Sequence, residues 1–211
     1  MSNVPGYLVE SRKVTTVCLI LEGYEEWYYF RRLNEIAVFS RVYAITLINA
    51  KSATSIPAKF QEAYSSNSYD LVLVVCDYDR VPNAFNQVVA GLNTFLGPNK
   101  ASVILTFTRP CTLQVILLHF GSANLTTQSK LAAQGIVEEL TGVANYDAHK
   151  DQLESIAGKI YHRSWQPMSA RLELLSTDCN VIPSTNILIL FRNLCSDGSK
   201  WILNINKSLE Q

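Results

Sequence analysis

Three carboxylates in this chain follow apolar segments in a way that indicates a shared ligand. Glu22 comes directly after the apolar run 14–21, and Asp77 and Asp79 come directly after the run 69–76. Because side chains alternate along an extended chain, Asp77 and Asp79 are expected to project to the same side. Like charges held this close repel one another unless a cation neutralises them. Carboxylate oxygens with room for water are typical ligands of Mg²⁺ or Mn²⁺ rather than zinc, so these residues form a candidate metal site.

Apolar runs alternate with segments of helical spacing in the first half of the chain. Strands are predicted at 14–21, 42–48, 69–76 and 101–107, and helices at 24–38, 55–65 and 82–95. Glu25 and Glu26 suit the first turn of the first helix. This alternation predicts a three-layer α/β core, 14–107, with a mainly parallel four-stranded sheet. Ligands of such sheets sit outside the carboxyl ends of the strands, so the three carboxylates converge there if the first and third strands are neighbours, about 4.8 Å apart.

The second half of the chain has a helical character. Helices are predicted near 112–120, 127–140, 148–161, 167–176 and 184–194, and 201–206 is predicted to be a closing strand or an irregular tail. His119 lies in an apolar helical segment and is interpreted as a structural rather than a catalytic histidine. No linker-like segment separates the two halves. Residues 108–211 are therefore expected to form a helical extension packed on the core, as one structural unit.

Composition narrows the class of protein. Eighteen Lys and Arg balance eighteen Asp and Glu, which argues against an unspecific nucleic-acid coat protein but leaves room for a local basic groove. The five cysteines include no Cys-x-x-Cys pair, so zinc ribbons and thioredoxin-like redox chemistry are not expected. The first residues lack a signal-peptide pattern, and no apolar run approaches the roughly 20 residues of a membrane-spanning helix. A cytoplasmic protein without a membrane segment is expected.

Four sequence motifs resemble those of a known family. The segment ILEGYEEWYYF (20–30) is similar to the opening motif of Toprim domains, especially those of the RloB-like group, and VVCDYDR (74–80) resembles their Asp-x-Asp strand. RPC followed by ILLHF (109–120) and IPSTN (182–186) resemble two later motifs of the RloB-like group. The motifs stand in the family order and extend over residues 20–194, which is nearly the whole chain.

The resemblance implies a fold, an activity and partners. It implies a Toprim-like, Rossmannoid sheet that binds Mg²⁺ (or Mn²⁺) through Glu22, Asp77 and Asp79, which would be the catalytic residues of a nuclease acting on phosphodiester bonds of DNA or RNA. RloB-like proteins are associated with bacterial anti-phage defence, often beside an ATPase, so an ATPase partner subunit and self-association are both compatible with it. Glu22 is the candidate general base for an attacking water. Arg80 and Arg109 are candidates for binding nucleic-acid phosphates, although Arg80 could instead pair with a carboxylate.

The chain also departs from the family pattern. Leu113 stands where the family has a Glu, Arg109 where it has an Asn, and Thr112 where it has a Phe. If that Glu helps to hold a metal, the protein is instead a catalytically weakened binding or regulatory subunit of a defence complex. A third hypothesis is a phosphatase of the haloacid-dehalogenase type, because the D-x-D-x-V segment 77–81 mimics its nucleophile motif. That motif normally belongs to the first core strand of the chain, whereas here two predicted strands precede the strand that carries it.

Overall fold

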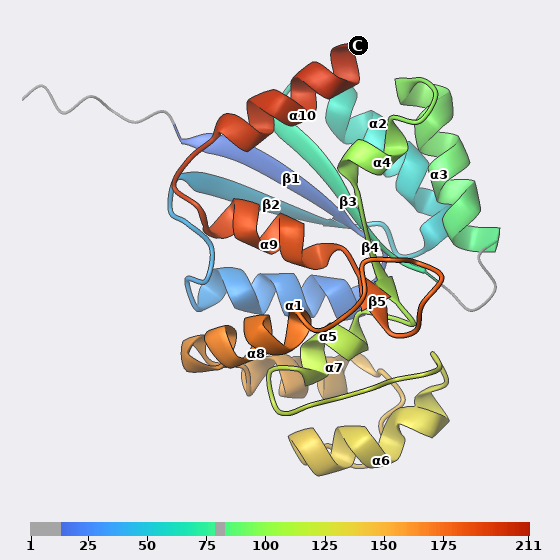
Figure 1. Ribbon diagram of the computed structural model, residues 1–211, viewed down its shortest axis with the longest axis vertical. Helices are drawn as coiled ribbons and strands as arrows, with labels where there is room; N and C mark the ends of the chain where they lie inside the picture. The colour runs from blue at the N-terminus through green and yellow to red at the C-terminus, as the bar shows by residue number, and fades with distance from the viewer. Residues whose placement is uncertain (1–13, 79–82) are drawn as a thin grey trace, which may run out of the picture.

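The computed structural model describes residues 14–78 and 83–211, and a five-stranded sheet forms its centre (Figure 1). The strands are β1 (Thr15–Leu21), β2 (Tyr43–Asn49), β3 (Leu71–Asp77), β4 (Leu105–Arg109) and β5 (Ser184–Thr185), in the spatial order β2-β1-β3-β4-β5. The first four are parallel and β5 is antiparallel to β4. The α/β class and the mainly parallel sheet are confirmed. The sheet has one strand more than predicted, because a two-residue segment from the second half of the chain joins its edge.

The first strand lies between β2 and β3. Leu21 pairs with Asn49 on one side and with Val75 on the other, so β1 is buried on both faces and its apolar run is continuous. The chain moves from β1 outward to β2 and then returns to place β3 on the opposite side. This reversal creates a topological switch point between β1 and β3, where open α/β sheets bind ligands. The first and third strands are neighbours, which is the condition for the carboxylates to converge.

Helices cover both faces of the sheet. On one face lie α1 (Tyr24–Glu35) and α9 (Ile187–Cys195), and on the other lie α2 (Ile56–Ser65), which follows the short 3₁₀ turn η1 (Ala53–Ser55), and α3 (Asn83–Leu96) (Figure 1). Each turns a buried stripe toward the strands, such as Phe30 and Leu33 on α1 or Val88 and Leu92 on α3. The three layers place the amino terminus of α1 directly beyond the carboxyl end of β1.

The predicted strand 101–107 is partly wrong. Its first residues form a short helix, α4 (Ala101–Ile104), and β4 begins only at Leu105. Ala101 and Ile104 are both buried by this single turn. A short apolar run does not distinguish a buried turn of helix from a buried strand, because both leave its side chains in the core.

The second half contains the predicted helices with shorter bounds. They are α5 (Leu113–Leu117), α6 (Lys130–Thr141), α7 (Lys150–Gly158), the 3₁₀ turn η2 (His162–Ser164), α8 (Trp165–Leu172) and α9. The strand or irregular tail predicted at 201–206 is wrong, because this segment belongs to α10 (Lys200–Glu210). Trp201 Nε1 donates a hydrogen bond to the hydroxyl oxygen of Tyr43 at 2.9 Å, and Asn206 Nδ2 donates to the carbonyl oxygen of Asp70 at 3.0 Å. These bonds hold α10 across the amino ends of β2 and β3.

The outer edge of β4 is completed by side chains. The backbone N–H of Phe107 donates to Oδ1 of Asn186 at 2.8 Å, and the Thr185 hydroxyl donates to the carbonyl oxygen of Phe107 at 2.6 Å. Both partners belong to the IPSTN motif. This motif therefore fixes the strand that leads into the loop after Arg109. Within the described ranges, the structure contains no helix long and apolar enough to cross a membrane.

Candidate metal centre

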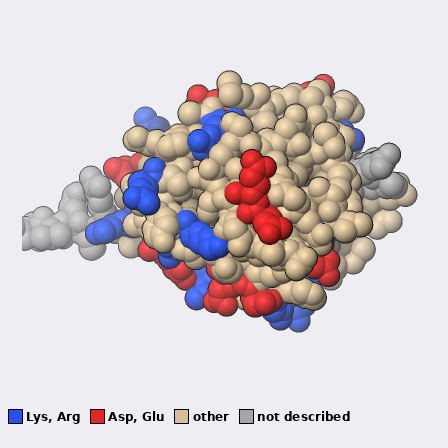
Figure 2. All heavy atoms as spheres, turned by 90° about the horizontal axis from the view of Figure 1, so that it is seen from below, with Lys and Arg blue, Asp and Glu red and all other residues tan. Residues whose placement is uncertain are grey.

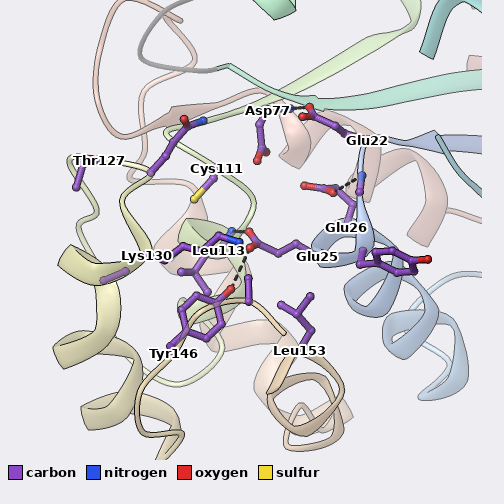
Figure 3. A pocket seen from close by; sticks show the side chains of 15 residues that line it. Glu22, Glu25, Glu26, Asp77, Cys111, Leu113, Thr127, Lys130, Tyr146 and Leu153 are labelled. Atoms are coloured by element: carbon purple, nitrogen blue, oxygen red, sulfur yellow. Dashed lines mark hydrogen bonds between the residues drawn. The ribbon is translucent and has the colours of Figure 1, made fainter. Parts of the chain in front are cut away.

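A cavity of about 390 Å³ lies beyond the carboxyl ends of β1, β3 and β4 (Figure 3). One wall carries acidic side chains and a thiol, and the opposite wall comes from α6 with the residues just before it, α7 and the segment that joins the two helices. The acidic wall includes Glu22, Glu25, Glu26, Asp77 and Cys111, and the opposite wall includes Thr127, Lys130, Ala133, Tyr146 and Leu153. The cavity thus occupies the switch point of the sheet, bounded by both halves of the chain.

Asp77 is the last residue of β3 and points into the cavity (Figure 3). Its Oδ1 accepts three hydrogen bonds: from the Thr108 hydroxyl at 2.6 Å, the Thr112 amide at 2.9 Å and the Thr112 hydroxyl at 3.0 Å. These donors fix the orientation of the carboxyl group. Burial nevertheless raises the pKa of Asp77 well above its usual range, and the neighbouring charges of Glu26, Glu25 and Glu22 raise it further.

Glu25 reaches the cavity from the first turn of α1. Its Oε1 accepts a hydrogen bond from the backbone N–H of Leu113 at 2.5 Å, and its Oε2 accepts one from the Tyr146 hydroxyl at 3.0 Å. Burial raises the pKa of Glu25 to about 7, and the charge of Glu26 adds to this effect. The two hydrogen bonds and the charge of Lys130 oppose the rise. Glu25 therefore titrates near neutral pH in the metal-free protein.

Glu22 and Glu26 complete the acidic wall. Oε2 of Glu22 accepts hydrogen bonds from the backbone N–H of Asp77 at 2.9 Å and from the Cys76 thiol at 3.0 Å, so it ties the end of β1 to the end of β3. Oε2 of Glu26 accepts from the backbone N–H of Gly23 at 2.9 Å, which caps α1. Glu26 is buried, and burial raises its pKa although the hydrogen bond from Gly23 lowers it.

Cys111 brings a sulfur atom to the same place. One ligand atom each of Glu25, Asp77 and Cys111 lies within 4.8 Å of the other two. The three residues come from the first turn of α1, the end of β3 and the loop after β4. Burial raises the pKa of the Cys111 thiol, and the charges of Glu25 and Asp77 add to the rise. These three residues could together hold a cation, so they form the candidate metal centre.

Some of the predicted site residues lie at the cavity, and others lie outside the described residues or away from the cavity. Glu22 and Asp77 lie on one cavity wall, held together by a hydrogen bond, while Asp79 and Arg80 lie outside the described residues. The Arg109 guanidinium lies over the Tyr78 ring, 5.0 Å from its centroid, and donates to the carbonyl oxygen of Cys179. Arg109 does not line the cavity. Its role in binding phosphates stays a prediction.

Sequence reasoning missed three members of the site. The sequence pattern indicates only a helix-stabilising role for Glu25 and Glu26, and it indicates no role for Cys111. A signal existed for the two acids, because they begin the helix that follows the carboxyl end of a buried parallel strand. Cys111 likewise follows the carboxyl end of a strand, β4, but the predicted strand ends at 107, two residues before the end of β4. Only the pairing of β4 beside β3 shows that the loop after Arg109 reaches Asp77.

Comparisons of this chain with protein-family models, with curated proteins and with solved structures each return no match. The likeness to Toprim domains thus remains a resemblance of short sequence motifs. The order of these motifs and the geometry of the cavity are the two observations that bear on function.

Proposed function

We propose that this protein is a divalent-metal-dependent nuclease of the Toprim type, which acts on phosphodiester bonds of DNA or RNA in bacterial anti-phage defence. The convergence of Glu25, Asp77 and Cys111 within 4.8 Å at the switch point of a parallel sheet carries the proposal. The motif resemblance supports the substrate class and the biological setting. The same resemblance supports an ATPase partner subunit.

The donor set suits a cation. Four carboxyl groups in one wall repel each other when ionised, and burial of like charges is costly unless an opposite charge compensates them. Glu25 and Asp77 would hold the ion, with Glu22 beside them and Asp79 expected to contribute from the following segment. Mg²⁺ or Mn²⁺ is the ion that the motif resemblance implies for these oxygen ligands. Such an ion supplies Lewis-acid polarisation of a phosphoryl oxygen and stabilises the charge that develops on it.

The surrounding residues hold these acids in fixed positions. Thr108 and Thr112 orient Asp77, and Tyr146 orients Glu25. Carboxyl groups positioned by such partners need little rearrangement to bind a ligand. Glu22 is held at the cavity wall through its Oε2, where its carboxylate can accept a proton from an attacking water.

The distribution of surface charge favours a short nucleic-acid segment that enters the cavity over a long duplex that contacts much of the protein surface. Figure 2 shows the face beneath α6, where acidic side chains gather near the centre and Lys and Arg side chains lie apart from one another, separated by uncharged surface. The chain carries no net charge. A long duplex held by many phosphate contacts needs a basic groove. We therefore expect a strand end, a single strand or a nucleic acid presented by a partner subunit.

A binding or regulatory subunit is the second candidate function. The Leu113 side chain is buried and lines the cavity where the family has an acid. Both oxygens of Glu25 already accept hydrogen bonds, from Leu113 and Tyr146. These contacts favour a site that binds an ion or a phosphate more weakly than an intact nuclease centre would.

A cleavage assay separates the two functions. Purified protein is incubated with labelled single-stranded DNA, duplex DNA and RNA in Mg²⁺ or Mn²⁺, with a chelator as the blank. We expect cleavage that Asp77→Asn abolishes and that Glu62→Gln retains, since Glu62 is an exposed acid on α2, outside the cavity lining. Binding without cleavage, alone or with the products of neighbouring genes, would leave only the second candidate.

A further inference from the structure

We propose that Cys111 is a direct metal ligand and that its sulfur makes this centre prefer thiophilic divalent ions, such as Zn²⁺, over Mg²⁺. This inference rests on the metal centre of the proposed function and narrows the class of ion that the centre takes. It differs from the expectation drawn from the sequence, which considered oxygen ligands alone.

The distances allow a single ion to bind all three donors. Ligands arranged tetrahedrally at about 2.0–2.3 Å from a zinc ion lie about 3.3–3.8 Å from one another. The ligand atoms of Glu25, Asp77 and Cys111 are already within 4.8 Å of each other. A contraction of at most about 1.5 Å per pair would close the set around an ion, which side-chain rotations can provide.

The loop that carries Cys111 is anchored on both sides of the thiol. The carbonyl oxygen of Cys111 accepts a hydrogen bond from the backbone N–H of Gln114 at 3.1 Å. The carbonyl oxygen of the preceding Pro110 accepts one from Nε2 of Gln128 at 2.7 Å. The sulfur is thereby held at the cavity wall, where Figure 3 shows it beside Asp77 and Glu25. A thiol buried in a protein core usually packs among apolar groups, whereas the half-buried Cys111 lies beside two carboxyl groups.

Three protein ligands next to a cavity match a known class of site. Catalytic zinc sites use three protein ligands and keep the remaining position for water or substrate. The cavity of about 390 Å³ provides room for such a fourth ligand. Thiolate is a soft ligand that favours zinc, whereas Mg²⁺ demands oxygen ligands in near-octahedral geometry. On binding, the thiol proton leaves to solvent and the sulfur coordinates as thiolate, so the charge is balanced.

Cobalt titration tests the sulfur ligand without any need for enzymatic activity. Co²⁺ added to the metal-free protein should produce a thiolate-to-metal charge-transfer band in the near ultraviolet. Zn²⁺ should remove this band by displacement, and a large molar excess of Mg²⁺ should not. Changes in the second shell alone alter metal affinity about 10–100-fold, so loss of a direct ligand in Cys111→Ser should weaken Zn²⁺ binding by at least about tenfold and abolish the band.

A matched cysteine variant serves as the control. Cys195 lies at the end of α9, where its thiol donates to the carbonyl oxygen of Val38, and Cys195→Ser should keep the band unchanged. Should Cys111→Ser fail to fold, alkylation of the wild-type protein gives the same answer. Zn²⁺ should protect Cys111 from iodoacetamide, as read by peptide mass spectrometry, and Mg²⁺ should not.

The outcomes distinguish this inference from the proposed function. A Co²⁺ complex without a charge-transfer band, or a band that survives Cys111→Ser, would overturn the sulfur ligand while leaving an oxygen-only metal centre. A protein that binds none of Co²⁺, Zn²⁺, Mn²⁺ and Mg²⁺ in calorimetry would overturn the metal centre itself.

Discussion

The backbone N–H of Leu113 donates a hydrogen bond to Oε1 of Glu25 over 2.5 Å. Leu113, one of the three departures from the motifs that the chain resembles, thus contacts the site through its main chain, while its side chain fills part of the cavity wall. A change of this side chain can leave the hydrogen bond in place. Position 113 is therefore a place where the chemistry of the cavity can be altered with the local backbone preserved.

Replacing Leu113 with Glu should place a further acid in the cavity. We expect the free energy of unfolding of the metal-free protein to fall by about 3 kcal/mol, because the new charge is buried without a partner. Saturating Mn²⁺ should recover most of this loss if the new carboxylate joins the ion. Thermal unfolding with and without Mn²⁺ measures both effects. Leu113→Gln is the control of similar size, and equal recovery by Mn²⁺ in this variant would contradict the prediction.

Replacing Asp77 with Asn should abolish the stabilisation of the folded protein by the metal ion. The variant loses a charge that three neighbouring carboxyl groups repel, so the melting temperature of the metal-free protein should hold or rise. A ligand at a hundred times its dissociation constant stabilises a native state by about 2.7 kcal/mol, and this gain should appear in the wild type alone. Cleavage should fall by several orders of magnitude. A variant that still gains stability from the ion would show that Asp77 is not a ligand.

Replacing Tyr146 with Phe should loosen Glu25 without opening the core. The ring of Tyr146 is fully buried and stays in place, while Glu25 loses the hydrogen bond to its Oε2. The pKa of Glu25, about 7 in the wild type, should rise further because that bond lowers it. A hydrogen bond to a charged group contributes about 1.5–3 kcal/mol, so the destabilisation should be larger at pH 8.5 than at pH 5.5, where Glu25 is protonated. Equal destabilisation at both pH values in urea unfolding would refute the assignment.

His119 gives a pH dependence that is separate from the acidic wall. It is buried between the Tyr29 hydroxyl at 3.0 Å and the Ser164 hydroxyl at 2.8 Å, as expected of a structural histidine. Burial, with a contribution from the charge of Arg171, lowers the pKa of His119 to about 3. Below the ordinary histidine pKa of about 6.5 the unfolded chain binds a proton that the native state does not, so stability falls as pH drops from 6.5 toward 3.

His119→Gln should remove this contribution. The stability advantage of the wild type over the variant should shrink as pH falls, by up to about 1.4 kcal/mol per pH unit. Urea unfolding of both proteins at several pH values between 7 and 4, with a metal chelator present, gives the difference directly. Parallel stability curves for the two proteins would contradict the lowered pKa.

The main sheet could be predicted from the sequence because its strands carry strong local signals. The continuous apolar runs before Glu22 and Asp77 indicate strands buried on both faces, and an acid ends each run. The sequence alone does not show whether these two strands are neighbours. In the structure β1 lies beside β3, and this strand order allows the backbone N–H of Asp77 to donate a hydrogen bond to Glu22.

The features that the sequence did not predict depend on contacts between segments far apart in the chain, which the local sequence pattern does not indicate. β5 has two residues, and the pairing of Thr108 with Thr185 that defines it joins segments far apart in sequence. The helix α10 is stabilised where it crosses the sheet, by the contact of Trp201 with Tyr43. Cys111 reaches the metal centre only because β4 lies beside β3. Periodicity reports which face of an element is buried, and it does not report which buried surfaces meet.

The origin of the site from separate segments has a consequence for the order of events during synthesis. Glu25, Asp77 and Cys111 come from segments after β1, β3 and β4, and Tyr146 closes on Glu25 from still later in the chain. A nascent chain that has left the ribosome only as far as β3 has the two acids but not the thiol. The complete donor set exists only after β4 has joined the sheet. Capture of an ion by all three donors therefore requires a nascent chain that extends past β4 to Cys111.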